Sequence, residues 1–245
     1  MKRSMTIMML FLGIFSASKS FGNSYETDTF RTKHNHNLVI TFIKHGSLEI
    51  RYENQFIQVD PVSMFADYST FPKADFILIT HEHADHLDTK SIKSLTKEST
   101  TIVMNESSAK QANLPQTKIM KNGDRMILSN FITLDAVPAY NTTPGHEQFH
   151  PRNRDNGYIL TIDGLRIYIA GDTEDIPEMK NLKNIDIAFL PVNQPYTMTV
   201  AQAIRAAKMF SPKILYPYHF GNTNVKPLKD ALKGTGIEVR VRKME

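Results

Sequence analysis

The sequence contains no cysteine. A chain without cysteine has no disulfide, no thiolate metal ligand, no cysteine nucleophile and no lipoprotein-type lipid anchor. The sequence also lacks a Gly-x-Ser-x-Gly segment, the usual mark of a hydrolase with a serine triad. Hydrolysis by a thiol or a triad serine is therefore poorly supported, and the chemistry has to be sought in other side chains.

Long apolar runs are also lacking, apart from one near the N-terminus. Lys2 and Arg3 precede a mostly apolar stretch from Met5 to Phe15, and Ser16-Ala17-Ser18 follows it. This pattern predicts a cleavable signal peptide over residues 1–18, because a membrane-spanning helix needs roughly 20 apolar residues. We expect a periplasmic or secreted protein, in a location where a chain without thiols meets no redox problem. An uncleaved anchor is the alternative, and the short run fits it less well.

Charge of one sign is not in large excess. The formal net charge is +4 and the pI is about 9.1, with no run of lysine and arginine interleaved with aromatic residues. We therefore expect a small-molecule substrate, no nucleic acid and no stable membrane anchor, while the oligomeric state stays open. Residues 19–37, with His34 and His36, are predicted to be a flexible N-terminal segment whose histidines are solvated. Residues 38–245 are predicted to form one domain, because no repeat or linker divides them.

The most informative stretch is the motif His81-x-His83-x-Asp85-His86. It directly follows the apolar run Phe76-Ile77-Leu78-Ile79, which predicts a short buried strand. Two residues apart, as His81 and His83 are, side chains lie on one side of an extended segment. Imidazoles and carboxylates are ligands for zinc, iron and manganese. A polar loop that is merely rich in histidine is the alternative, but this spacing behind a strand favours a metal site.

The pattern His-x-His-x-Asp-His resembles the signature of the metallo-β-lactamase superfamily. The resemblance implies that His81 and His83 bind one metal ion and that Asp85 and His86 bind a second. It also implies the fold, a four-layer αβ/βα sandwich in which helices flank two mixed β-sheets. Four further segments resemble the branch of metal-dependent hydrolases related to ascorbate-6-phosphate lactonases and N-acylphosphatidylethanolamine phospholipase D: Ala139-Tyr140-Asn141, Gly157-Tyr158, Gly171-Asp172-Thr173 and Tyr196-Thr197-Met198.

Other candidate residues follow short apolar strands. Asp60, Asp172 and His219 each lie within a few residues of such a strand end, and ligands gather at that edge of a layered α/β fold. The resemblance implies that Asp172 bridges two metal ions and that His219 is the last metal-binding histidine. Asp60 is either a turn former or a carboxylate that orients a metal-bound histidine, and the resemblance favours the second role. His45, at a strand connection, is either a pocket-lining residue or an ordinary loop residue.

A third histidine for the first metal is not obvious. Many relatives of this branch carry it just after the strand that here ends in Pro138-Ala139, where this chain has Tyr140-Asn141. The following polar stretch, Tyr140 to Asn156, is predicted to be a long functional loop that contains His146 and His150. We favour His150, because it lies closer to the strand beginning at Tyr158. His146 is the alternative ligand.

These residues predict an exported hydrolase in which a metal-bound hydroxide attacks an ester, a lactone or a phosphodiester. Two Zn²⁺ ions per chain are expected, with Mn²⁺ or Fe²⁺ accepted by the same ligands. Asp85 and Asp172 are candidate catalytic residues because they ligate and orient the nucleophile. Tyr196 either binds an oxyanion or phosphate through its hydroxyl or packs over a helix start. The opposing hypothesis is a non-catalytic exported binding protein with an incomplete metal site.

Capping residues and apolar spacing predict two helices most clearly. Asp88 precedes a helix that runs to Leu95, and Thr199 precedes a helix that runs to Phe210. In the second helix, Ala203, Ala206 and Ala207 lie on one apolar stripe, as in a helix that covers a sheet.

Overall fold

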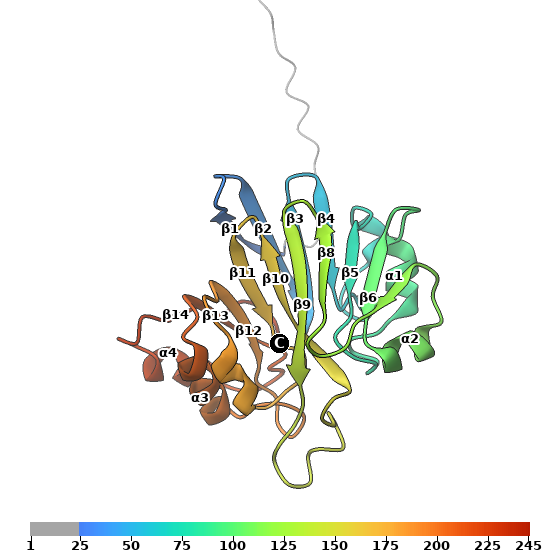
Figure 1. Cartoon of the computed structure of the whole chain (residues 1–245). Coiled ribbons are helices and arrows are strands. Elements are labelled where there is room, and N and C mark those ends of the chain that lie inside the picture. The colour runs from blue at the N-terminus through green and yellow to red at the C-terminus, as the bar shows by residue number, and fades with distance from the viewer. Residues whose placement is uncertain (1–24) are drawn as a thin grey trace, which may run out of the picture.

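The computed structural model describes residues 25–245, which form two β-sheets of seven strands each (Figure 1). The predicted signal peptide, residues 1–18, lies outside the described residues. No helix within residues 25–245 is both long and apolar enough to span a membrane.

The first sheet contains the N-terminal strands in sequence order, β1-β2-β3-β4-β5-β6-β7. Strands β1 to β4 are antiparallel, and β5 to β7 extend the sheet in parallel. The strands are β1 (Glu26–Arg31), β2 (Asn37–Lys44), β3 (Ser47–Tyr52), β4 (Gln55–Val59), β5 (Phe76–Leu78), β6 (Thr101–Met104) and β7 (Thr117–Ile119).

The second sheet has the same plan in the opposite order, β14-β13-β12-β11-β10-β9-β8. Strands β8 to β11 are antiparallel, and β12 to β14 add in parallel. The strands are β8 (Arg125–Ser129), β9 (Ile132–Ala139), β10 (Asp155–Ile162), β11 (Leu165–Ile169), β12 (Ile187–Pro191), β13 (Ile214–Tyr218) and β14 (Glu238–Val239).

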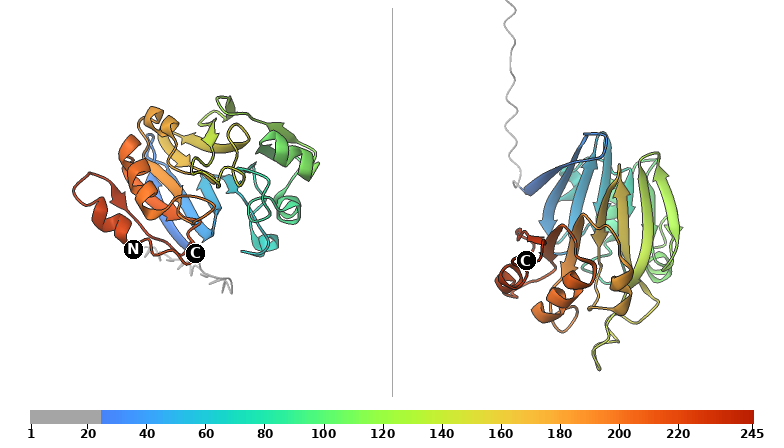
Figure 2. Two further views of the ribbon diagram at one scale, coloured as in Figure 1. Left: turned by 90° about the horizontal axis from the view of Figure 1, so that it is seen from below. Right: turned by 60° about the vertical axis from the view of Figure 1, so that its left-hand side comes forward.

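Helices cover the outer faces of the two sheets. Seen from below, the green helices and the orange and red helices lie on opposite sides of the strands (Figure 2). The helices are α1 (Thr89–Leu95), α2 (Glu106–Ala112), α3 (Val200–Phe210) and α4 (Lys226–Ala231). Short 3₁₀ turns at Tyr68–Thr70 and Pro177–Asn181 complete the connections.

The period of two along each strand divides the core into layers. Leu78 of β5 and Val103 of β6 face the main core between the sheets, whereas the adjacent Ile77 and Ile102 pack with Ile92 of α1 on the outer face. The main core is continuous across the sheets, since it holds strands from both. This arrangement confirms the predicted four-layer sandwich.

The two helix predictions are confirmed to within one residue. Asp88 caps α1 by accepting a hydrogen bond from the N–H of Lys90. Thr199 and Gln202 form a reciprocal capping box at the start of α3. The ring of Phe210, at the end of α3, packs edge-on against Tyr168 of β11, with ring centres 5.5 Å apart. Helix α3 therefore covers the outer face of the second sheet.

The N-terminal expectation needs a correction. Residues 26–31, predicted to belong to a flexible segment over 19–37, form β1, which pairs along its whole length with β2. Half-buried and exposed residues alternate along β1, but most of them are polar, so the sequence shows no apolar alternation there. His34 and His36 are about half exposed, as expected, although each contacts a carboxylate, Asp163 and Glu53 respectively.

Candidate metal centre

A cluster of histidines and aspartates lies at one edge of the sandwich, where strands of both sheets end. The parallel strands β4 and β5, and β11 and β13, each direct their carboxyl ends to this edge. The cluster residues come from these elements: His45 from the β2–β3 turn, Asp60 after β4, His81 to His86 after β5, His150 from the β9–β10 loop, Asp172 after β11 and His219 after β13.

Asp172 is the centre of this cluster. Its Oδ2 lies 3.2 Å from Nε2 of His219, 3.4 Å from Nε2 of His150 and 3.8 Å from Nε2 of His81. Its Oδ1 lies 3.5 Å from Nε2 of His86. Four imidazoles from three separate parts of the chain thus face one carboxylate, and each is at most 2% exposed.

The donor atoms divide into two groups that share Asp172. We call His81, His83 and His150 the His83 group, and Asp85, His86 and His219 the Asp85 group. Within each group the donor atoms lie within 4.8 Å of one another, and His45 also falls within that distance of the Asp85 group. The resemblance had implied the pairs His81 with His83 and Asp85 with His86; the structure adds His150 to the first pair and His219 to the second.

The β9–β10 loop brings His150, and not His146, to the cluster. The N–H of Asn141 donates to the carbonyl of His150 at 2.9 Å, and its side-chain amide donates to the carbonyl of His146 at 3.2 Å. His146 is directed to Glu174, with Nδ1 3.6 Å from Oε1. Asn141 thus holds the loop that supplies His150.

The unpaired atoms of the cluster fit a bound cation. Among the described residues, Nε2 of His86, His150 and His219 and Oδ1 of Asp172 are buried without a hydrogen-bond partner. Buried polar groups without partners are costly and rare unless a ligand or ion satisfies them. These lone-pair donors face one another, so the arrangement fits divalent metal ions bound by nitrogen and oxygen.

Comparison with known proteins identifies the family. Residues 39–219 match the Beta-lactamase superfamily domain, a span that contains the whole cluster. This chain belongs to the metallo-β-lactamase superfamily.

Its relatives within the superfamily are named as metal-dependent hydrolases. A UPF0173 metal-dependent hydrolase of Ligilactobacillus salivarius is 32% identical over 193 residues, which cover 74% of this chain and 84% of the relative. A crystal structure of a protein from Parabacteroides distasonis, described as a metal-dependent hydrolase, is 64% identical with a TM-score of 0.89. That match covers 91% of this chain and all of the other. Igni18, a metallo hydrolase of Ignicoccus hospitalis, shares the fold at 21% identity with a TM-score of 0.67, over 85% of this chain and 96% of that one.

In this member of the superfamily, one carboxylate orients two histidines. Asp60 is fully buried, and its Oδ2 lies 2.8 Å from Nδ1 of His86. The same Oδ2 accepts a hydrogen bond from the Thr80 hydroxyl at 2.7 Å, and that hydroxyl lies 2.9 Å from Nδ1 of His81. In the wiring that satisfies every group, both histidines carry their proton on Nδ1. Nε2 of each ring then carries the lone pair that a metal would take. Nε2 of His86 has no hydrogen-bond partner among the described residues, and Nε2 of His81 lies 3.1 Å from Nδ1 of His83.

A second carboxylate, which the sequence did not reveal, lies behind the third histidine. Oδ2 of Asp155 lies 3.1 Å from Nδ1 of His150, and both residues are buried. Arg154 holds Asp155 through Nε at 2.7 Å and also contacts Glu82 at 3.0 Å. Asp155 is the first residue of β10 and pairs with Ala139 at the end of β9. The sequence predicted that this strand begins at Tyr158, so Asp155 was left in the loop and gave no signal of its own.

The electrostatics of the centre suit metal ligands. Burial alone raises the pKa of Asp172, but His219 and His86 outweigh it and hold that pKa well below its usual range. Burial, reinforced by His86, lowers the pKa of His81 well below its ordinary value. Burial also lowers the pKa of His219, yet the carboxylates of Asp172 and Asp85 raise it to about 10. An ionised carboxylate and neutral His81 are ready to ligate, while His219 has a proton to release on metal binding.

Tyr196 lies apart from this network. Its side chain is 46% exposed, and its ring packs edge-on against Phe149 with ring centres 5.0 Å apart. No hydrogen bond within residues 25–245 joins its hydroxyl to the cluster; its carbonyl accepts one from Asn141 at 2.7 Å. The predicted oxyanion-binding role of Tyr196 therefore remains a prediction.

Proposed function

We propose that this protein is a hydrolase with a two-ion metal centre that cleaves an ester, lactone or phosphodiester bond. The observation that supports this most is Asp172, a buried carboxylate faced by Nε2 of four histidines whose other nitrogens are tied elsewhere or unpaired. Divalent ions held there would supply a more acidic water and positive charge beside the scissile bond.

The chain's own residues have distinct roles in this proposal. The His83 group and the Asp85 group would each hold an ion, and Asp172 lies between the two groups. Asp85 is the most solvent-accessible of the acidic ligands, with 41% of its side chain exposed, so substrate and water would approach from its side. Asp60 and Asp155 keep the rings of His86 and His150 in the tautomer that ligates.

A cavity at Arg154, the residue that holds Asp155 behind His150, is lined by several basic side chains. This cavity of about 510 Å³ is lined by four cationic side chains and one acid. These are Lys110, Lys121, Arg152, Arg154 and Glu106. Arg154 belongs both to this wall and to the hydrogen-bond network behind His150. A phosphate or carboxylate of a substrate bound there would compete with Glu106 for Lys110 and Lys121 and with Glu178 for Arg152.

The opposing hypothesis, a binding protein with an incomplete metal site, depended on a missing third histidine. With His150 beside His81 and His83, that premise has no support in the geometry. A catalytic protein is therefore the hypothesis we retain.

A hydrolysis screen tests the proposal. Purified protein loaded with Zn²⁺, Mn²⁺ or Fe²⁺ is assayed against lactones, thioesters, phosphomonoesters and phosphodiesters, beside His81→Ala, Asp172→Ala and the exposed-histidine control His36→Ala. We expect turnover of one class, lost in the first two variants and kept in the control. Full metal loading without turnover, and ligand binding unchanged in His81→Ala and Asp172→Ala, would favour the binding protein.

The substrate's charge and the location are tested separately. Replacing Lys121 and Arg152 by alanine should raise KM for an anionic substrate several-fold and leave kcat nearly unchanged, whereas Lys208→Ala, exposed on α3, should change neither.

We also propose export, supported by the pattern of residues 1–18. Mass spectrometry of the natural protein should find that leader removed, and an intact leader in a cytoplasmic fraction would contradict export.

A further inference from the structure

His45 lies at the tip of the β2–β3 hairpin, where Lys44 pairs with Ser47 and leaves a two-residue turn. Its φ is +57°, a conformation that residues other than glycine rarely adopt. Asp60 and His219 share this feature, with φ of +42° and +47°. At these positions the backbone turns sharply where a strand ends, which directs a side chain into the cluster.

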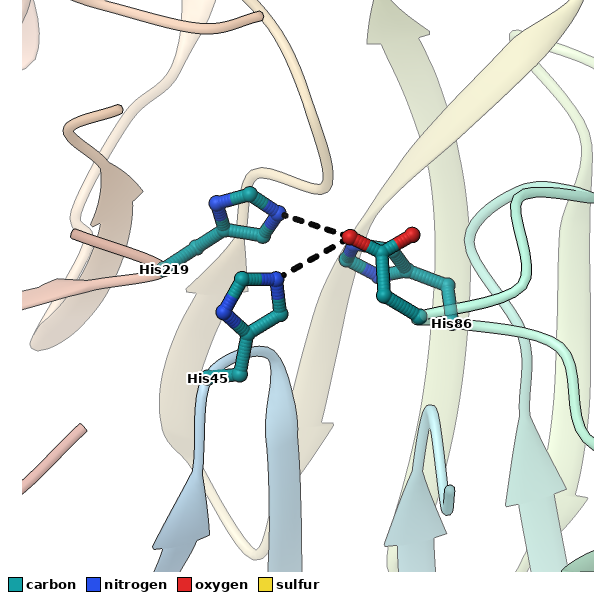
Figure 3. Close-up of side chains that lie close together, drawn as sticks. His45, His86 and His219 are labelled. Carbon is teal, nitrogen blue, oxygen red and sulfur yellow. Dashed lines mark hydrogen bonds and ion pairs between the residues drawn. The ribbon is translucent and has the colours of Figure 1, made fainter. Parts of the chain in front are cut away.

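Contacts on three sides fix the His45 side chain, and Figure 3 shows its ring beside that of His219. Its ring lies over that of His219, with ring centres 3.6 Å apart, and Phe65 packs against it with ring centres 5.1 Å apart. Its Nε2 lies 3.1 Å from Oδ2 of Asp85. The carbonyl of His45 also accepts a hydrogen bond from the N–H of His219 at 3.0 Å. The hairpin tip thereby contacts both Asp85 and His219 of the Asp85 group.

We infer that His45 is a positioning residue for Asp85, donating its Nε2–H to the carboxylate and holding it in the geometry that ligates. The side chain of Asp85 is 41% exposed, whereas that of His45 is only 15% exposed. The same Oδ2 also lies 3.6 Å from Nε2 of His219, which is itself a candidate ligand. A carboxylate facing solvent has several orientations available, and a rigid donor selects one of them.

The contacts of His45 differ from those of the four histidines that face Asp172, although its donor atom lies within 4.8 Å of those of Asp85, His86 and His219. His81, His86, His150 and His219 each place Nε2 within 3.8 Å of Asp172. The ion-pair contact of His45 within the described residues is to Asp85. His45 therefore acts through Asp85 and stands outside the circle of donors around the bridging carboxylate.

The test is a metal titration of chelator-stripped protein, and it rests on the proposed two-ion centre. Zn²⁺ binding is measured by competition with a chromophoric chelator in wild type, His45→Asn and His45→Gln. Asparagine tolerates the left-handed backbone but is too short to reach Asp85, whereas glutamine places an N–H donor near the position of Nε2. We expect His45→Asn to weaken one of the two Zn²⁺ equivalents about 10- to 100-fold, and His45→Gln to restore most of that affinity.

Co²⁺ spectra and a matched variant complete the design. His36→Asn changes a histidine at the other end of β2 and should bind both equivalents like wild type. Saturated His45→Gln should give the wild-type Co²⁺ absorption spectrum, because no ligand has changed. Wild-type affinity in His45→Asn would overturn the inference, and so would a saturated His45→Gln spectrum that has lost a nitrogen ligand. Wild type that binds no metal would overturn the proposed function as well, which separates the two failures.

Discussion

Replacing Asp60 by asparagine should uncouple two metal-binding histidines at once. Oδ2 of Asp60 accepts from the Thr80 hydroxyl at 2.7 Å and lies 2.8 Å from Nδ1 of His86. Oδ1 accepts from the N–H of Thr80 at 2.8 Å. Asparagine fits the same space and tolerates the φ of +42° at least as well as aspartate does. Its oxygen can keep the bond from the Thr80 N–H, so its NH₂ group then faces Nδ1 of His86.

Two donors then oppose each other unless His86 changes its tautomer. A change would move the proton to Nε2, the atom that faces Asp172 at 3.5 Å, and would block metal binding. A hydrogen bond to a charged group contributes about 1.5–3 kcal/mol. Since asparagine has no charge to bury, part of this loss is recovered. We expect the unfolding free energy of the metal-free protein to fall by about 1–3 kcal/mol.

Metal affinity is the sharper readout. Partners behind metal-bound histidines typically contribute about 10- to 100-fold in affinity, which corresponds to about 1.4–2.8 kcal/mol. Urea unfolding of chelator-treated protein gives the first quantity, and Zn²⁺ competition with a chelator gives the second. Asp230→Asn, an exposed aspartate on α4, is the matched control and should shift stability by less than about 0.5 kcal/mol. Wild-type Zn²⁺ affinity in Asp60→Asn would refute the proposed tautomer control.

Three further predictions follow from the same contacts. Asp155→Asn should weaken Zn²⁺ binding at the His83 group about tenfold or more, measured by the same competition, and unchanged affinity would mean that its contact with His150 is incidental. Gly46→Ala should also weaken metal binding, because a Cβ there would lie 2.8 Å from Cε1 of His86; calorimetry showing full binding would contradict this. Burial raises the pKa of Asp163, but hydrogen bonds from Thr32 and His34 outweigh it and lower that pKa to about 2. A depressed carboxyl pKa stabilises the fold above the ordinary value near 4, so wild type should lose stability between about pH 4 and 2 more steeply than Asp163→Asn in urea titrations; parallel curves would refute it.

The sequence was sufficient wherever the signal was local. The apolar run before His81 marks β5, and the spacing of the histidines after it marks the candidate metal site, because both patterns lie in the one short stretch from Phe76 to His86. Helix α3 was equally visible, since Thr199 caps it and its alanine stripe repeats at the helical period. In each case the residues that make the structure are also close together in the sequence.

Strand β1 was not predicted, because its residues lack the apolar alternation of a strand and it is held in place by pairing with β2. Residues 26–31 are mostly polar, and they form a strand through backbone hydrogen bonds with β2. Backbone hydrogen bonds form whatever the side chains are, so they leave no pattern in the sequence. An edge strand of polar residues therefore looks like a loop in the sequence.

The metal-binding motif and its strand were determined by the sequence alone, because short-range periodicity and spacing encode them. The fold class followed from the resemblance of that motif to a known superfamily. The choice of His150 over His146, the carboxylate of Asp155 behind it and the contact of His45 with Asp85 were decided only by the tertiary structure. The contact of His45 with Asp85 joins two segments that are far apart in the chain. The contacts within the β9–β10 loop are between near neighbours in the sequence, but their geometry depends on strand register and on loop hydrogen bonds such as those of Asn141. A histidine in a loop becomes part of the centre only when those distant partners place it there.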